Sequence, residues 1–264
     1  MPDYSGHAVK AGEHDTALVA QLQDGLHALG YGPFQRGVFD ANMTSIVRLF
    51  QSQHVDRSGR PLDADGIVGA QTWSAIFGAD TAPAGIVAAP NALAQKAVEI
   101  AQGEVGTMEK PVGSNSGPRV DQYLSSVGIA PGEGSADDRY WCMAFAYFCV
   151  DSAAHAVGVA NPLYRTAGVI EQWNKCASRP GVRRITQAEA LAEPSLVQPG
   201  QILILDHGGG LGHTGIIVAV DAPHLTVVEG NASGKPNDRN GTGVFRTTFR
   251  KTNDGLVKGY LAFD

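Results

Sequence analysis

The sequence predicts an α+β protein with a helical N-terminal domain and a C-terminal domain built on a central antiparallel β-sheet. Four leucines near the N-terminus recur at helical spacing: Leu18, Leu22, Leu26 and Leu29. Near the C-terminus, two β-branched runs, residues 214–220 and 225–231, flank a short turn, which is the pattern of a β-hairpin. Between these regions residues 79–91 are rich in Ala, Pro and Gly and lack any period, so they are predicted to be a linker.

Length and charge narrow the class of protein. A chain of 264 residues, 43% of them hydrophobic, can bury one core of ordinary size and a smaller one, so two domains are expected. The formal net charge is −6 and no basic stripe is present, which argues against nucleic acid as a partner. No apolar stretch approaches the roughly 18 residues of a membrane span, and the N-terminus lacks a signal-peptide pattern. We therefore expect a monomer that is made in the cytoplasm without a signal peptide and does not insert into membranes.

The first domain is expected to follow a tail, residues 1–14, and to form a three-helix unit over residues 15–78. Asp15 can cap the first helix, and Gly30 falls where that helix should stop. A second helix follows the segment GVFD and carries an apolar face made by Ile46, Val47, Leu49 and Phe50. An Asp/Gly turn then leads into a short helix that carries Trp73 and Ile76.

Three segments of this domain are similar to a known family. LQDGLHALGY, GVFDANMTSIVRLFQSQ and DADGIVGAQTW resemble the peptidoglycan-binding domain that often accompanies bacterial and phage wall hydrolases. The resemblance covers residues 15–78. It implies affinity for the glycan or the stem peptide of the wall, so bacterial peptidoglycan is the expected partner.

A Trp-Cys pair, Trp141 and Cys142, lies where a loop rich in Gly, Ser and Asp meets an apolar helix. Cys142 is either a small buried hydrophobe or a nucleophile at a helix N-terminus. Asp137 or Asp138 can cap the preceding turn, which would leave the N–H groups of the helix start to face the sulfur or to stabilise an oxyanion.

A catalytic cysteine needs a base within hydrogen-bond reach, and His213 is the best placed of eight histidines. It begins the strand HTGIIVAV, whereas His207 and His224 fit surface loops. If the hairpin turns between Ala222 and Pro223, paired residue numbers sum to about 445. His213 then lies nearly opposite Asn231, and Glu229, two residues away, projects on the same face. Either side chain can hold the second ring nitrogen, and the pattern does not choose between them.

The second domain, residues 92–264, is also similar to a known family. YWCMAFAYFCV, QPGQILILDHGGGLGHTGIIVAV and LTVVEGNAS resemble the CHAP domain, the cysteine, histidine-dependent amidohydrolase/peptidase of the papain-like and NlpC/P60 group. The resemblance implies a nucleophile at Cys142, a general base at His213, an orienting residue at Glu229 and a fourth site position at Asn231. The remaining cysteines, Cys149 and Cys176, are expected to be structural.

The segment before the cysteine extends this resemblance. GEVGTMEKPVGSNSGPRVDQYL is similar to the segment found there in some members, which implies that Glu109 and Asn115 line the groove together with Trp141 as substrate-binding residues. The sequence departs from the family at Gln201, where Asp is common. Because this position precedes a strand, the change is expected to affect a turn more than the chemistry.

We therefore interpret the chain as a modular peptidoglycan hydrolase that cleaves an amide bond, as an N-acetylmuramoyl-L-alanine amidase or as a stem-peptide or cross-bridge endopeptidase. No cofactor and no metal are expected, since HGGGLGH lacks the HxH and HExxH spacings of a metallohydrolase. A non-catalytic wall-binding protein is the alternative. The protein is expected to reach the wall after lysis, as a phage-type endolysin, or by specialised secretion, as an antibacterial effector with a delivery or immunity protein.

Overall fold

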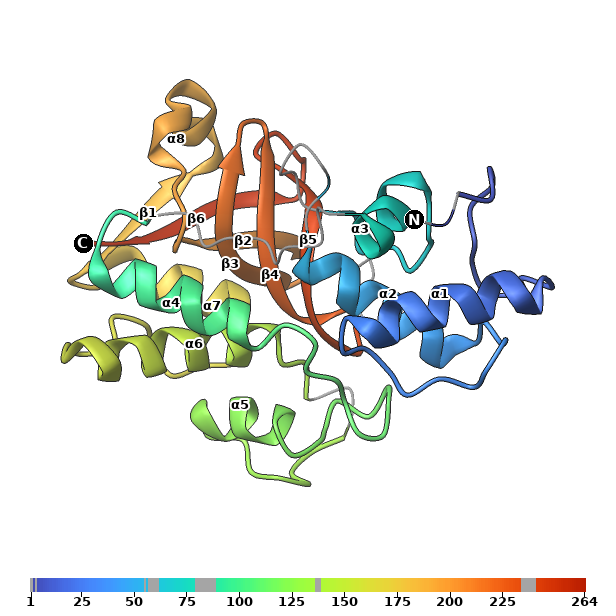
Figure 1. The fold of residues 1–264 in the computed structure, drawn as a ribbon. Coiled ribbons are helices and arrows are strands. Elements are labelled where there is room, and N and C mark those ends of the chain that lie inside the picture. The colour runs from blue at the N-terminus through green and yellow to red at the C-terminus, as the bar shows by residue number, and fades with distance from the viewer. Residues whose placement is uncertain are drawn as a thin grey trace. The chain divides into compact units, whose positions relative to one another are not determined.

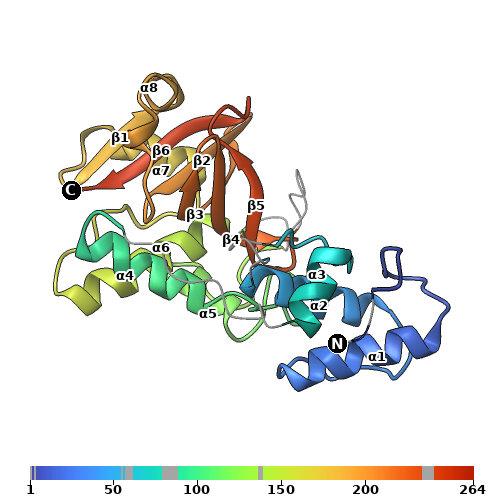
Figure 2. The ribbon, with the colours of Figure 1, turned by 45° about the horizontal axis from the view of Figure 1, so that its top comes forward.

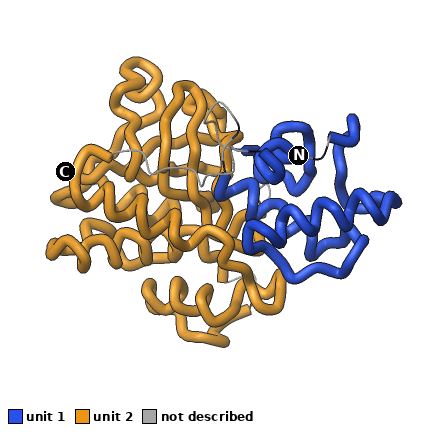
Figure 3. Tube along the Cα trace, viewed as in Figure 1, with its two compact units in different colours: residues 1–85 blue, residues 86–264 orange. Residues whose placement is uncertain are grey.

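The computed structural model divides the chain into two compact units, Met1–Gly85 and Ile86–Asp264 (Figure 3). It describes residues 2, 4–54, 56, 62–78, 89–135, 139–233 and 241–264. The division falls within the predicted linker, most of which lies outside the described residues.

The described residues of the first unit form three helices, α1 (Thr16–Ala28), α2 (Ala41–Gln53) and α3 (Ala70–Phe77). Asp15 caps α1, because its Oδ1 accepts hydrogen bonds from the N–H groups of Ala17 and Leu18. The core of this unit includes ten fully or nearly fully buried helix residues: Val19, Leu22, Leu26, Met43, Val47, Phe50, Trp73, Ala75, Ile76 and Ile46. Of the predicted leucine stripe, Leu18 and Leu29 are only partly buried and pack against this core.

The second unit contains an antiparallel sheet of six strands within the described residues, in the order β1-β6-β2-β3-β4-β5 (Figure 1). The strands are β1 (Val182–Thr186), β2 (Ile202–Gly208), β3 (Leu211–Asp221), β4 (His224–Ala232), β5 (Gly243–Lys251) and β6 (Val257–Phe263). The α-helices among the described residues of this unit are α4 (Ala92–Gly103), α5 (Val120–Ser126), α6 (Cys142–Val157), α7 (Val169–Lys175) and α8 (Gln187–Ala192). The predicted α+β fold class is confirmed.

The hairpin of β3 and β4 has the predicted turn at Ala222 and Pro223, since Asp221 pairs with His224. The register shifts between Ala219 and Ile217. Ile217 therefore pairs with Val227, one residue away from the partner that the predicted sum of 445 gives. The sequence-based register is therefore correct to within one residue.

Helix α6 lies beside α4 and packs against β3 and β4, as Figures 1 and 2 both show. Ten of its residues are buried: Cys142, Met143, Ala144, Phe145, Ala146, Tyr147, Cys149, Val150, Ala153 and Ala154. Gly158 ends the helix in a left-handed conformation with φ 74°. Among the described residues, no helix is both long and apolar enough to cross a membrane.

Candidate active site

Cys142 is the first residue of α6, and its side chain is buried. The preceding Trp141 occupies the N-cap position, where its carbonyl oxygen accepts the N–H of Phe145 at 2.8 Å. Among the described residues, no side chain caps this helix, so the first-turn N–H groups lack the usual side-chain acceptor. The predicted capping residues Asp137 and Asp138 lie outside the described residues.

The structure brings Cys142, His213 and Glu229 together. His213 comes from β3, which packs against α6, and its side chain interacts with the thiol of Cys142 and the carboxylate of Glu229. The Oε2 atom of Glu229 lies 3.6 Å from Nε2 of His213, close enough for an ion pair but beyond hydrogen-bond distance. All three side chains are at least nine-tenths buried, so their charges are poorly screened by water.

The electrostatics of this group favour the charged forms. Burial alone would lower the pKa of His213, but its interactions with Cys142 and Glu229 outweigh burial and raise the pKa to about 9. Burial alone would raise the pKa of Glu229, but the charges of Arg250 and His213 lower it to about 2. At neutral pH the site therefore holds a carboxylate beside an imidazolium.

Arg250, on β5, is a site neighbour that the sequence analysis missed. Its Nε donates to Oε1 of Glu229 at 2.6 Å, and its Nη2 donates to Oε2 at 3.2 Å. Both side chains are buried, with Arg250 5% and Glu229 1% exposed. No local signal in the sequence marks Arg250, because it follows Glu229 by 21 residues and depends on strand pairing.

Asn231 reaches the site through an irregular strand. Its φ of 52° is left-handed, a conformation that asparagine adopts more readily than most residues, and the β4–β5 register shifts between Glu229 and Ala232. The predicted alternation of Glu229 and Asn231 on one face therefore does not describe this segment. The side chain is 2% exposed, and within the described part of the chain its Oδ1 has no hydrogen-bond partner.

A cleft of about 270 Å³ opens over the cysteine and the histidine. It is lined by Tyr140, Cys142, Ala167, Gly168, Val169, His207, Gly210, Leu211, Gly212, His213 and Asn231. The prediction that His207 is a surface loop residue is wrong in this respect, since His207 belongs to β2 and lines the cleft. Gly208, Gly209 and Gly210 all have positive φ, so the glycine run after His207 was the available signal for a tight hairpin at a functional site.

The three predicted substrate-binding residues are all buried. Trp141 is 0% and Glu109 1% exposed, and Nε1 of Trp141 donates to Oε1 of Glu109 at 2.9 Å. Asn115 is 7% exposed, and its carbonyl oxygen accepts a hydrogen bond from Arg139 at 3.3 Å. These contacts hold the start of α6 in place. Direct contact with substrate stays a prediction for all three residues.

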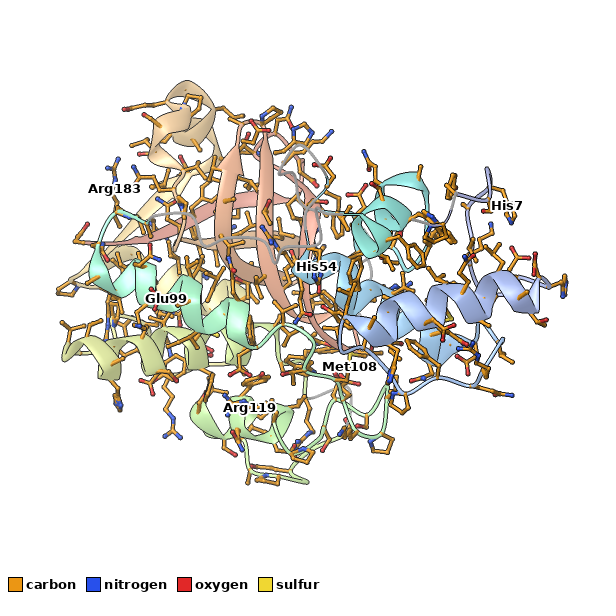
Figure 4. The ribbon with its side chains drawn as sticks, viewed as in Figure 1. His7, His54, Glu99, Met108, Arg119 and Arg183 are labelled. Atoms are coloured by element: carbon orange, nitrogen blue, oxygen red, sulfur yellow. The ribbon has the colours of Figure 1, made fainter. Side chains whose placement is uncertain are left out.

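The segment between α4 and α6 is fixed to the rest of the unit at two further points. Met108 and Arg119, both labelled in Figure 4, come from this segment. Met108 forms a β-bridge with Gly243, and Arg119 pairs with Glu104 and lies 4.7 Å from the ring centroid of Phe148 on α6. The segment therefore supports the helix that carries Cys142.

Three further predicted positions lie in structural surroundings. Cys149 and Cys176 are free thiols, and burial raises the pKa of both. Gln201 precedes β2, and its Nε2 donates to the carbonyl oxygen of Leu196 at 2.7 Å. Within the described residues, no group of three or more His, Cys, Asp or Glu side chains could hold a metal ion.

A thiol, an imidazole and a carboxylate grouped on an α+β fold are the parts that a cysteine-dependent amidase or peptidase needs. Comparison with protein families agrees with this class, because residues 134–231 match the CHAP domain. Residues 15–76 match the putative peptidoglycan binding domain. The chain thus has the domain organisation of a modular peptidoglycan hydrolase. Neither the curated proteins nor the solved structures give a significant match.

Proposed function

We propose that this protein hydrolyses an amide bond of bacterial peptidoglycan by a Cys-His-Glu mechanism. The observation that carries the proposal is the interaction of Cys142 with His213 in a cleft, with Glu229 beside the same imidazole. The match to the CHAP domain supports hydrolysis, and the match to the putative peptidoglycan binding domain supports the wall as substrate.

In the proposed starting state the proton of the Cys142 thiol already resides on His213, and in the first half-reaction the thiolate attacks the amide carbonyl carbon. The negative charge that develops on the carbonyl oxygen is stabilised by N–H groups of the first turn of α6. The imidazolium then gives its proton to the departing amine as the C–N bond breaks, which leaves a thioester on Cys142.

In the second half-reaction neutral His213 takes a proton from a water molecule as that water attacks the thioester. The C–S bond breaks, the carboxylic acid product leaves, and the thiolate is restored beside the imidazolium. Glu229 keeps its charge throughout and stabilises the imidazolium each time it forms.

The side chains that line the cleft suit an amide bond, which carries no charge. Its lining combines two exposed apolar side chains, Tyr140 and Leu211, with small residues at Ala167 and Gly168 that leave room for a chain. An amidase and an endopeptidase both act on such a bond. The proposed setting is the wall itself, reached as a phage-type endolysin after lysis or as a secreted antibacterial effector.

The test is hydrolysis of purified peptidoglycan by the wild-type protein and by Cys142→Ala, followed by mass analysis of the new termini. Cys142→Ala is expected to abolish hydrolysis and leave wall binding intact, because alanine suits a helix start and only the sulfur is lost. The matched controls Cys149→Ala and Cys176→Ala should retain most activity, since neither residue lines the cleft. Substantial hydrolysis by Cys142→Ala would contradict the Cys-His-Glu mechanism. No hydrolysis by the wild-type protein would contradict the whole proposal and favour a non-catalytic wall-binding protein.

A further inference from the structure

We infer that Arg250 is a positioning residue of this site, whose guanidinium holds Glu229 in the orientation and the charge state that His213 requires. The inference rests on the proposed cysteine hydrolase function. It adds a fourth charged residue, from an edge strand, to the three residues of the proposed mechanism.

The first support is the geometry of the carboxylate. Arg250 grips Glu229 with two donors, Nε to Oε1 at 2.6 Å and Nη2 to Oε2 at 3.2 Å. Such a two-point grip fixes the plane of a carboxylate, which a single bond does not. The oxygen that faces Nε2 of His213 is Oε2, so Arg250 sets where that oxygen lies.

The second support is how the fold places the guanidinium. Strand β5 pairs with β4, but the register shifts between the pairs Leu225–Arg250 and Val227–Thr247. Arg250 pairs with Leu225, and its long side chain reaches along β4 to Glu229, which lies four residues further on from Leu225. The guanidinium carbon also lies 4.8 Å from the ring centroid of Phe249, so the arginine is held on a second side.

The third support is the balance of buried charge. Glu229 faces two cations, Arg250 from β5 and His213 from β3, and His213 in turn faces the Cys142 thiol from α6. In the ion-pair form of the mechanism, a thiolate and a carboxylate are matched by an imidazolium and a guanidinium, so the group is neutral. Without Arg250 the same group carries one uncompensated negative charge, and such a charge is costly in a buried site.

A direction of effect follows from this balance. The pKa of Glu229 is held at about 2, so its charged form is present above that pH and is lost as the pH falls through it. Burial raises the pKa of Glu229, and without Arg250 only His213 lowers it. The carboxylate must therefore lose its charge at a higher pH in a variant without Arg250. When the guanidinium is removed, activity should therefore be lost at a higher pH on the acidic side of the profile.

The experiment compares Arg250→Gln and Arg250→Lys with the wild-type protein and with a matched control, Arg184→Gln. Arg184 lies on β1, the opposite edge of the sheet, and donates to the carbonyl oxygen of Trp173. Two profiles are measured from pH 4 to pH 10: hydrolysis of purified peptidoglycan, and alkylation of Cys142 by iodoacetamide, followed by peptide mass analysis. The alkylation profile reports on the thiol without any substrate.

Arg250→Gln is expected to move the acidic limb of both profiles from below the measured range to above pH 4, a shift of about two pH units or more and about a hundredfold loss at a pH on that limb. Arg250→Lys keeps the positive charge but cannot make both hydrogen bonds to Glu229. The acidic limb of its pH profile should therefore stay at the wild-type pH, while its maximal rate falls on the order of tenfold. Arg184→Gln should match the wild-type profiles. A folded Arg250→Gln protein with wild-type limbs overturns the inference. If Arg250→Gln does not fold, a wild-type maximal rate in Arg250→Lys overturns it instead.

The two proposals fail in different ways. If the wild-type protein hydrolyses no peptidoglycan, the proposed function is wrong, and the alkylation profiles alone still decide the role of Arg250. If hydrolysis depends on Cys142 but both Arg250 variants keep wild-type profiles, only the inference about Arg250 is wrong.

Discussion

The substitution Glu229→Gln tests how the imidazole of His213 is charged. It removes the negative charge between His213 and Arg250 while nearly keeping the side-chain shape. The interactions of His213 with Cys142 and Glu229 raise its pKa from an ordinary 6.5 to about 9 despite burial. That rise corresponds to roughly 3 kcal/mol of preference for the imidazolium. Because the charge of Glu229 contributes to this rise and burial opposes it, the pKa of His213 should fall toward or below its ordinary value in the variant.

The assay is an NMR titration of the His213 ring in protein with labelled histidine, run on the wild-type protein and the variant. Hydrolysis should fall roughly ten- to a thousandfold, because the imidazolium loses its counter-charge. Loss of the carboxylate also leaves Arg250 without its buried partner, so circular dichroism must show that the variant is folded.

The comparator is Asn231→Ala, which removes a neighbouring cleft side chain without removing a charge. Its effect on the pKa of His213 should be small, and its loss of rate should be less than that of Glu229→Gln. An unchanged pKa of His213 in the folded Glu229→Gln protein would refute the electrostatic reasoning. A larger loss of rate in Asn231→Ala would show that Asn231, rather than Glu229, orients the imidazole.

The remaining predictions concern the two domains and the packing of α6. A protein that begins near Pro90 should cut soluble wall fragments but bind intact sacculi more weakly than the full chain, because tethering raises the local concentration at the wall; equal binding in a sedimentation assay would exclude a targeting role for the first unit. Gly230→Ala should lower stability to denaturant by about 1 to 3 kcal/mol, since the new Cβ would lie 2.5 Å from Cβ of Phe145 and 2.8 Å from the Trp141 ring. The control Gly103→Ala meets nothing within 4 Å and should be neutral or stabilising, so equal stability of the two variants would contradict this packing argument.

Local patterns in the sequence predicted those features that depend on neighbouring residues. The cap at Asp15 and the turn at Ala222 and Pro223 follow from short-range rules, and both are present. The placement of Cys142 at the start of a helix followed from a change of composition within a few residues. The pairing of β3 with β4 was within reach because a two-residue turn fixes the register of a hairpin.

Features that depend on distant pairing were not predictable in the same way. Arg250 meets Glu229 through the pairing of β4 with β5, 21 residues apart along the chain, and no local pattern in the sequence specifies that contact. Asn231 leaves the regular strand by adopting a positive φ, so counting residues along β4 could not give the direction of its side chain. His207 lines the cleft because the hairpin of β2 and β3 turns on three glycines, whose combined geometry a residue pattern does not specify.

The nucleophile lies on a buried helix, whereas part of the cleft lining comes from loops, and this difference affects how the protein can change during evolution. The cysteine is carried by a helix with ten buried residues, so most substitutions there would disturb the packing that holds the sulfur. The rest of the lining includes Gly210 and Leu211 at the hairpin tip and Ala167 and Gly168 in a loop, and none of these four residues is buried. Insertions and substitutions in these two loops can therefore alter which wall chemistry is accepted while the thiol and the imidazole keep their distance. New substrate preferences should arise by loop exchange on an unchanged reactive centre.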